Sequence, residues 1–473
     1  MLLKLTVDDK NKAIMSEIYF SNYRLKKDTH YFLYIGSIRN FGLNLYLKEA
    51  LSKIYHRPFD FISIVQDVFA RYPYPNMMVV NPLAADFSRT HGKNGSCRLI
   101  TKDFMSCVSA DPDVLQLAEQ LLKRQKKLYV YMYQSVPEMT LSQWPGVVII
   151  GPDSKISERV NSKIFQYKSL EGLFPLPDYR VCIGLEALIK TTEPLWQKWT
   201  DGIFVTEEYS AGGLKSIVAH DADDILKRFE DKQQNYLISR YIPHKDDPTV
   251  LGVVANERDI YIAGVADQFI EHGTRFVGSV FPSIHKKMVM TQLDLYTRKA
   301  GQWLAREGFR GMFGCDYLVD SRGRINFLEV NARKQGTATE FCCTLENTLP
   351  RGSAMLPELE YYAVFQEKFP EHSIEPHDNS KTIHWGTHNY KTQGIIHTGS
   401  AIFEHRSERD VFRRLAGNRV DQEILILDHI GPNFVVAEKS FLARIIALGK
   451  DRAGVLKGLD QGKKDVESTI CFI

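Results

Sequence analysis

Two carboxylates, an amide and a guanidinium are spaced through a segment of this chain whose pattern predicts a β-hairpin. Asp316 lies in one apolar run, and Glu329, Asn331 and Arg333 lie in or directly after the next one. Between the two runs, Asp320-Ser-Arg-Gly323 is a hairpin turn signal. Side chains on a strand repeat every two residues, so the last three site residues are expected on one face. Asp316 is expected to approach that face from the partner strand.

The residue types in this hairpin suit the binding of magnesium and phosphate. Mg²⁺ prefers oxygen ligands, which Asp316, Glu329 and Asn331 supply. Arg333 can pair with a phosphate or with negative charge that develops during a reaction. The alternative is an ordinary antiparallel pair of strands with a polar solvent face. The preceding pattern Gly311-x-x-Gly-x-Asp316, at the spacing of a hairpin partner, favours a site.

The motifs Gly314-Cys-Asp316 and Leu328-Glu-Val-Asn-Ala-Arg333 closely resemble the metal-binding end of ATP-grasp enzymes. This resemblance implies that Asp316, Glu329 and Asn331 bind the magnesium ions that bridge the phosphates of ATP. It also implies that Arg333 is catalytic, because the family's arginine stabilises the transferring phosphate or the tetrahedral intermediate. The cofactors implied are ATP and Mg²⁺.

The same resemblance assigns nucleotide contacts upstream of the hairpin. Asn161-Ser-Lys163 looks like the family's first nucleotide-contacting lysine, Tyr209 to Ser216 like its flexible glycine loop, and Tyr236 to Ile242 like the strand that pairs with the adenine edge. Asp246 or Asp247 either accepts from the ribose hydroxyls or is a surface acid in a turn. The nucleotide-binding residues implied are Lys163, Ser210, Gly212, Gly213, Lys215, Ile238, Arg240, Tyr241 and Asp246.

Two positions depart from the family's pattern. The expected strand Gly202-Ile-Phe-Val-Thr-Glu-Glu208 lacks the lysine that many members carry there. Ser239 and Arg240 stand where an acidic residue is common. Either Lys215 or Arg240 compensates, or the chain belongs to a divergent branch.

The elements that position these residues alternate between strands and helices. Short, nearly continuous apolar runs such as Tyr31 to Ile35 and Leu128 to Tyr133 predict parallel strands that are covered on both faces. A helical pattern from Val114 to Lys127 has Asp111 and Asp113 near its start as caps. The fold class expected is α/β (α+β), with three parts: an N-terminal α/β pre-ATP-grasp domain over 1–152, an ATP-grasp domain over 153–350 with a small mobile lid at about 180–245, and an additional C-terminal α+β domain over 351–473.

Composition narrows the classes of partner. The 60 basic and 57 acidic side chains of the 473 residues nearly balance, which argues against a nucleic-acid partner. No run approaches the roughly 20 apolar residues of a membrane span, and the first ten residues have no signal-peptide core. The seven cysteines lack framework spacing and fit reduced thiols. We therefore expect a cytoplasmic protein that binds neither nucleic acid nor membrane.

Short motifs narrow the expected reaction. Gly151-Pro-Asp153, Asp178-Tyr-Arg180 and Gly431-Pro-Asn-Phe-Val-Val-Ala-Glu438 are similar to pheganomycin-type peptide ligases. The activity implied is an ADP-producing ligase that joins a carboxylate to an amine through an acyl phosphate, on amino-acid or peptide substrates. A homodimer is a possible assembly.

Two alternatives remain open. The first keeps the fold and changes the reaction to a carboxylation or to another ATP-dependent ligation of a non-amino substrate. The second is a catalytically inactive nucleotide-binding sensor, which the missing lid lysine suggests.

Overall fold

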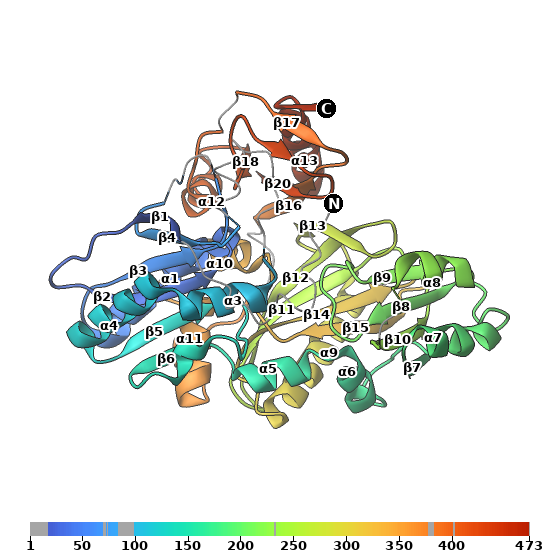
Figure 1. Ribbon diagram of the computed structural model, residues 1–473. Helices are drawn as coiled ribbons and strands as arrows, with labels where there is room; N and C mark the ends of the chain where they lie inside the picture. The colour runs from blue at the N-terminus through green and yellow to red at the C-terminus, as the bar shows by residue number, and fades with distance from the viewer. Residues whose placement is uncertain are drawn as a thin grey trace.

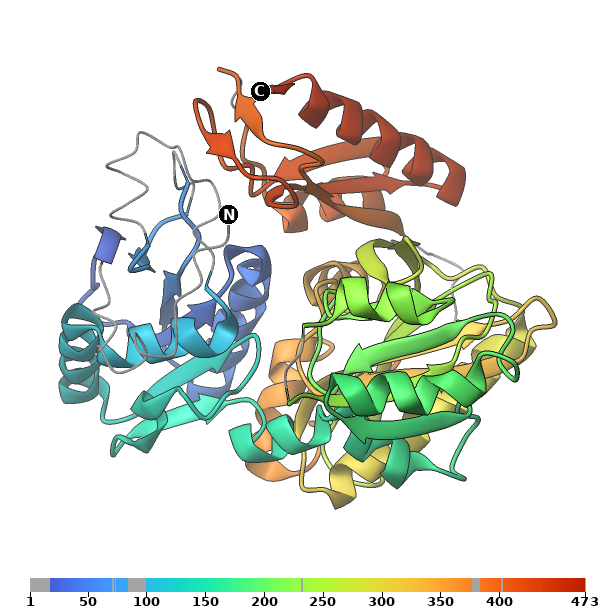
Figure 2. The ribbon, with the colours of Figure 1, turned by 45° about the vertical axis from the view of Figure 1, so that its right-hand side comes forward.

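The computed structural model describes residues 18–69, 72, 74–83, 99–230, 233–376, 383–400 and 403–472. Within these ranges the strands form sheets of six, four, eight and three strands. Figure 1 shows the N-terminal sheet on one side, a small green sheet at the opposite end, and the red C-terminal part above them. Figure 2 shows the C-terminal part set across the other two. No helix of these ranges has both the length and the apolar character needed to cross a bilayer.

The N-terminal sheet has the order β1-β4-β3-β2-β5-β6. All neighbouring pairs except β1–β4 are parallel, as the apolar runs predicted. Parallel strands are covered on both faces, and alternate residues of β2 enter two different cores accordingly. The strands are β1 (Ile18–Asn22), β2 (His30–Gly36), β3 (Phe59–Val65), β4 (Met77–Val80), β5 (Leu128–Met132) and β6 (Val147–Ile150).

Helices on opposite faces cover this sheet. They are α1 (Gly42–Tyr55) on one face and α3 (Thr101–Ala110) and α4 (Pro112–Gln125) on the other. The cap expected at Asp111 is confirmed, because its carboxylate accepts from the backbone N–H groups of Asp113 and Val114. The short helices η2 (Ile38–Asn40) and η3 (Thr140–Gln143) lie in the connections after β2 and before β6.

A four-stranded antiparallel sheet lies in the segment predicted to be the lid and is called the lid below; its order is β7-β10-β8-β9. It has its own apolar core, built around Trp199 and Ile238. The connection from the N-terminal sheet runs through α5 (Ser154–Val160) and α6 (Lys163–Leu170). The lid's elements are β7 (Tyr179–Ile183), α7 (Leu185–Thr192), η4 (Glu193–Leu195), β8 (Ile203–Glu207), β9 (Ser216–Ala219), α8 (Ala222–Arg228) and β10 (Asn235–Arg240).

The largest sheet is antiparallel and has the order β15-β14-β11-β12-β13-β16-β20-β18. It continues across the domain boundary expected at 350, because β13 pairs with β16 from Gly278–His388 to Phe281–Trp385. Its strands are β11 (Pro248–Val254), β12 (Ile260–Glu271), β13 (Arg275–Phe281), β14 (Gly311–Val319), β15 (Ile325–Asn331), β16 (His384–Lys391), β18 (Gln422–Leu427) and β20 (Phe441–Gly449).

Helices also cover the faces of this large sheet. On its β11–β15 half, α9 (Lys287–Arg306) packs on one face, and α10 (Ala338–Thr348) and α11 (Leu356–Gln366) pack on the other. The β16–β20 half carries α12 (Glu408–Ala416) and α13 (Arg452–Glu467). A small sheet of β17 (Ile396–Thr398), β19 (Val435–Val436) and β21 (Ile470–Phe472) completes the C-terminal part.

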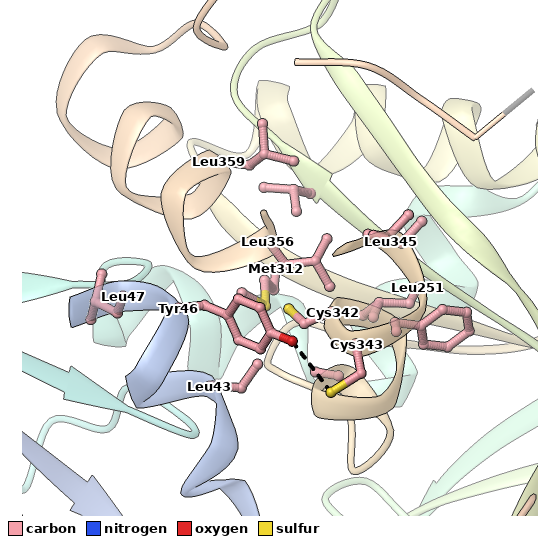
Figure 3. Packing of buried hydrophobic residues seen from close by; sticks show 14 of the residues in the cluster. Leu43, Tyr46, Leu47, Leu251, Met312, Cys342, Cys343, Leu345, Leu356 and Leu359 are labelled. Atoms are coloured by element: carbon pink, nitrogen blue, oxygen red, sulfur yellow. Dashed lines mark hydrogen bonds between the residues drawn. The ribbon is translucent and has the colours of Figure 1, made fainter. Parts of the chain in front are cut away.

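One apolar core joins the N-terminal sheet to the largest sheet. In Figure 3, Tyr46 of α1 lies against Cys342 and Cys343 of α10, and its hydroxyl donates to the Cys343 thiol at 3.3 Å. Leu356 and Leu359 of α11 belong to the same core. Because α1, α10 and α11 all contribute to this core, it fixes the N-terminal sheet relative to the largest sheet. It thereby also fixes the side chains at the ends of the strands.

Candidate active site

A cavity of about 470 Å³ lies where the N-terminal sheet, the lid and the largest sheet meet. The carboxyl ends of β2, β3 and β5 open onto it, which is the edge where α/β sheets bind ligands. Five successive strands of the largest sheet each contribute a polar residue to its lining: Asp316 of β14, Thr249 of β11, Gln268 of β12, Ser279 of β13 and Thr387 of β16.

The β14–β15 hairpin brings the predicted metal ligands together. Asp316 and Glu329 lie opposite each other in the antiparallel register, and Asn331 lies opposite Gly314. The Asn331 amide donates to Asp316 Oδ2 at 2.8 Å and to Glu329 Oε1 at 3.3 Å. The convergence expected from strand alternation is therefore present, and all three side chains line the cavity.

The two carboxylates have different electrostatic surroundings. Burial, followed by the negative charge of Glu329, raises the pKa of Asp316 to about 7. Burial would also raise the pKa of Glu329, but the charge and hydrogen bond of Lys163, together with Arg333 and Asn331, outweigh burial, so this pKa lies below its ordinary value. When two carboxyl groups are buried side by side, a nearby cation favours their ionised forms.

Arg333 follows β15 and points to the same cluster. Its guanidinium donates to Asn331 Oδ1 at 2.9 Å and to the hydroxyl of Tyr133 at 2.7 Å. Tyr133 directly follows β5 of the N-terminal sheet, and its ring centroid lies 5.5 Å from the guanidinium carbon. Tyr133 is not among the site residues predicted from the sequence. Its position at the carboxyl end of a parallel strand was the available signal.

Lys163 connects the hairpin to the glycine loop. It is the first residue of α6, after the N-cap Ser162, whose hydroxyl accepts from the Phe165 N–H at 3.1 Å. The Lys163 ammonium donates to the Glu329 carboxylate and, at 3.1 Å, to the backbone oxygen of Ser210. A single lysine thus contacts both the carboxylate cluster and the loop above it.

The glycine loop runs between β8 and β9, and Ser210, Gly212 and Gly213 line the cavity. Gly212 and Gly213 have φ angles of 59° and 72°, in the left-handed region that favours glycine. A Cβ on Gly213 would lie 1.7 Å from the backbone oxygen of Thr274 in the β12–β13 turn, whereas one on Gly212 would meet no atom within 4 Å. The loop can therefore approach this turn only because residue 213 is glycine.

Hydroxyl groups stand at the place where a lysine was expected on the lid. β8 presents Phe204 and Thr206 to the cavity. The Thr206 hydroxyl lies 2.9 Å from that of Ser210 and accepts from the Ser216 hydroxyl at 2.8 Å. β8 therefore contributes an aromatic ring and hydroxyl groups to the cavity, and no charge.

Three of the residues expected to bind the nucleotide lie outside the cavity lining. Lys215 pairs with Glu207, and its side chain is 53% exposed. Ile238 is buried in the lid core, because strand alternation turns Leu237 and Ser239 toward the cavity in its place. Asp246 forms a β-bridge with Val319.

The neighbouring residues of the lid and hinge do reach the cavity. Asp247 lines it where Asp246 was expected, and its carboxylate lies 3.0 Å from His244 Nε2. Arg240 and Tyr241, two further residues expected to bind the nucleotide, also line the cavity. Their backbone N–H groups are already occupied. Arg240 donates to the backbone oxygen of Asp178 at 2.8 Å, and Tyr241 donates to that of Gly202 at 3.1 Å.

The hairpin has the donor set of a magnesium site. Asp316, Glu329 and Asn331 offer only oxygen ligands, which a hard divalent cation prefers. Gln268 of β12 orients the Asp316 carboxylate, because its side-chain amide donates to Asp316 Oδ1 at 2.7 Å. Gln268, like Tyr133, is not among the site residues predicted from the sequence. The raised pKa of Asp316 marks a carboxylate that a cation would stabilise, so these residues fit Mg²⁺.

Comparison with known proteins identifies the domain that carries this site. Residues 160–337 match the family model of the ATP-grasp domain. The chain contains an ATP-grasp domain. The hairpin, Lys163 and the glycine loop all fall within the ATP-grasp match, whereas Tyr133 lies outside it.

One curated relative is similar to part of this chain. A [butirosin acyl-carrier protein]–L-glutamate ligase of Niallia circulans is 23% identical over 198 residues, which are 40% of this chain and 47% of the relative. This chain thus matches about half the length of that curated relative.

Solved structures extend the likeness to nearly the whole chain. The carboxyaminoimidazole ribonucleotide synthase of Aspergillus clavatus, complexed with ATP, has a TM-score of 0.55 at 12% identity and covers 92% of this chain and 98% of its own. The biotin carboxylase of Campylobacter jejuni has a TM-score of 0.58 at 13% identity, with 93% and 91% covered. At these identities the likeness shows the fold, and the α/β class predicted from the sequence is confirmed.

Proposed function

We propose that this chain is an ATP-dependent carboxylate–amine ligase that forms an amide or peptide bond through an acyl phosphate. The observation that carries the proposal is the convergence of Asp316, Glu329, Asn331 and Arg333 with Lys163 in one cavity of an ATP-grasp domain. The curated relative is itself named a ligase of L-glutamate, which supports amino-acid or peptide substrates.

The reaction divides the difficult substitution at a carboxylate into two steps. A carboxylate oxygen bonds to the γ-phosphorus of ATP as the bond from that phosphorus to the β-phosphate oxygen breaks, which gives an acyl phosphate and ADP. The nitrogen of the amine then bonds to the acyl carbon, phosphate leaves, and the amine loses a proton. Both steps develop negative charge on oxygen, which fixed cations stabilise.

The chain's residues have distinct tasks in this scheme. Asp316, Glu329 and Asn331 would hold Mg²⁺, which neutralises charge on the nucleotide phosphates. Lys163 would supply a compact positive charge beneath the glycine loop, whose backbone N–H groups cradle phosphate. Arg333, held by Asn331 and Tyr133, would stabilise the developing oxyanion.

Release of ADP and phosphate tests the proposal. The protein is incubated with Mg²⁺ and ATP and with amino acids and short peptides, singly and in pairs. We expect ADP release that requires both a carboxylate and an amine and that stops when a chelator removes the metal. Asn331→Ala should reduce it by about 100-fold or more, because it removes one expected ligand and the partner of Arg333.

Other products of the same assay would point elsewhere. Release of AMP would contradict the acyl-phosphate route and indicate adenylation. ADP release that requires bicarbonate in place of the amine would indicate a carboxylase. ATP binding without turnover across the whole panel would indicate the sensor.

A further inference from the structure

Asp316 has a second neighbour across the sheet, on the side away from Glu329. In the register of β11 and β14, Thr249 lies directly opposite Asp316. Residues that face each other across antiparallel strands have their side chains on one face of the sheet, with Cβ atoms about 4.5–5.5 Å apart. Both side chains line the cavity. The hydroxyl of Thr249 therefore lies within reach of the Asp316 carboxylate.

Gln335 contacts this hydroxyl from the segment that follows β15. Its side-chain amide donates to Thr249 Oγ1 at 2.7 Å. Gln335 is 8% exposed and Thr249 is 3% exposed, so both residues are buried. Within the part of the chain that the structure describes, the amide oxygen of Gln335 has no hydrogen-bond partner. The hydrogen bond to Thr249 is therefore the contact that fixes the amide group.

The hydrogen bond from Gln335 determines where the proton of the Thr249 hydroxyl points. A threonine hydroxyl has one proton to donate and two lone pairs that accept. Because one lone pair accepts from Gln335, the proton is free to point to the carboxylate of Asp316. Burial and the charge of Glu329 raise the pKa of Asp316, and a hydrogen bond with Thr249 lowers it, as expected when a donor stabilises the ionised form.

Gly314 leaves the space that the side chain of Gln335 occupies. Gly314 precedes Asp316 by two residues on β14, so the two positions share one face of the strand. A Cβ on Gly314 would lie 1.9 Å from Gln335 Nε2 and 2.3 Å from its Cδ. The φ angle of Gly314 lies outside the left-handed region, so the backbone conformation does not require glycine here. Glycine is needed at this position because the amide of Gln335 lies there.

We propose that Gln335 is a positioning residue of the magnesium site, which holds the Thr249 hydroxyl so that its proton points to Asp316 and keeps that carboxylate in place as a ligand. Gln335 acts through Thr249 and contacts neither the ion nor a substrate in this role. Outer partners that orient ligating carboxylates contribute about 10–100-fold to metal affinity. The inference deepens the proposed function, on which it rests for the identity of the ion.

The Mg²⁺ dependence of nucleotide binding tests this role without any turnover. A non-hydrolysable ATP analogue is titrated into the protein by calorimetry at a series of Mg²⁺ concentrations. Gln335→Met keeps the length of the side chain and removes its amide, so we expect the Mg²⁺ concentration that half-saturates binding to rise by about tenfold. Thr192→Val is the control, because it removes a buried hydroxyl, bonded to the Leu188 backbone oxygen at 3.1 Å, outside the cavity lining. An unchanged half-saturating concentration in Gln335→Met would overturn the proposal.

A double-mutant cycle tests whether Gln335 acts through Thr249. Thr249→Val keeps the shape of the side chain and removes the hydroxyl, so it should raise the half-saturating Mg²⁺ concentration by a similar factor. Residues that act through one hydrogen-bond chain have non-additive effects. We therefore expect the double variant Gln335→Met/Thr249→Val to match Thr249→Val within about twofold. A loss equal to the product of the two single effects would show that Gln335 acts independently of Thr249.

Gly314→Ala tests the same contact from the β14 strand. The added methyl group would displace the Gln335 amide, so this variant should need about tenfold more Mg²⁺ in the otherwise unaltered protein. In a Gln335→Ala background the space is free, and adding Gly314→Ala should change the half-saturating concentration by less than about twofold. A further large loss in that background would show that Gly314 affects the site by a route that does not involve Gln335.

Binding and turnover together separate this inference from the proposed ligase. Mg²⁺-dependent binding that weakens in Gln335→Met, without ADP release from any pair of substrates, would support the positioning role and count against the ligase. Ligation whose Mg²⁺ requirement is the same in Gln335→Met would support the ligase and overturn the positioning role. Absence of analogue binding at every Mg²⁺ concentration would overturn both. Thermal unfolding of each variant, followed by circular dichroism, verifies that folded proteins are compared.

Discussion

Arg333 is held by side chains from two distant parts of the chain. Asn331 belongs to the same hairpin, but Tyr133 comes from the N-terminal sheet, 200 positions away in the sequence. The phenol both accepts a hydrogen bond at 2.7 Å and places its ring beside the guanidinium. An arginine side chain has many rotamers, so a second fixed partner restricts where its charge lies.

Tyr133→Phe should therefore slow the chemical step. The change keeps the ring and removes the hydroxyl that accepts from Arg333, and a hydrogen bond to a charged group contributes about 1.5–3 kcal/mol. We expect kcat to fall by roughly tenfold or more while the KM for ATP stays within about twofold. Steady-state ADP release measures both constants. Tyr129→Phe, within β5, is the control, because it also removes a hydrogen-bonded hydroxyl but lies outside the cavity lining. An equal loss in both variants would contradict a positioning role for Tyr133.

At the scale of elements, the glycine loop depends on its contact with the β12–β13 turn. The loop belongs to the lid and the turn to the largest sheet, so the contact joins two separate sheets above the cavity. Gly213 makes this contact, whereas Gly212 lies in open space. The two neighbouring glycines therefore share a backbone requirement but differ in what a side chain would meet.

Gly213→Ala and Gly212→Ala separate these two effects. Both substitutions place alanine in the left-handed region, at a cost of about 1–2 kcal/mol. Only Gly213→Ala also drives a methyl group into the Thr274 carbonyl and displaces the loop. We expect its KM for ATP to rise by about tenfold, against about threefold or less for Gly212→Ala. Similar KM values for the two variants in the ADP-release assay would show that the turn contact has no part in nucleotide binding.

At the scale of the molecule, a buried ion pair connects the end of the β14–β15 hairpin to α11 and to the N-terminal sheet. Lys334 directly follows Arg333, and its ammonium lies 2.9 Å from Glu360 of α11. The two side chains are only 2% and 1% exposed. The ammonium also lies 4.1 Å from the ring centroid of Tyr131 in β5. The pair therefore links the hairpin, α11 and the N-terminal sheet at one point.

Lys334→Met should destabilise the protein strongly. It leaves the Glu360 carboxylate buried without its cation, and breaking one partner of such a pair costs about 3–5 kcal/mol. We expect the thermal unfolding temperature to fall clearly, and the double variant Lys334→Met/Glu360→Leu to recover much of the loss, because no buried charge is left unpaired. Differential scanning calorimetry measures both. An unfolding temperature that Lys334→Met leaves unchanged would show that the pair does not hold these segments together.

The local parts of the site were determined by the sequence itself. The β14–β15 hairpin follows from a turn signal between two apolar runs, and strand alternation then places Glu329 and Asn331 on one face. The parallel strands and the capped helix α4 were predictable for the same reason. Each depends on interactions between residues close in the chain, so a short window of sequence contains the required information.

The tertiary structure alone decided which distant residues meet. Alternation predicts that Ile238 and its neighbours face opposite sides, but only packing shows that Ile238 enters the lid core. Likewise, nothing near Tyr133 in the chain indicates Arg333. The pairing of β13 with β16 also joins strands more than a hundred residues apart. Such contacts are selected by how whole sheets and helices bury their apolar faces together, and this balance is set by the entire chain.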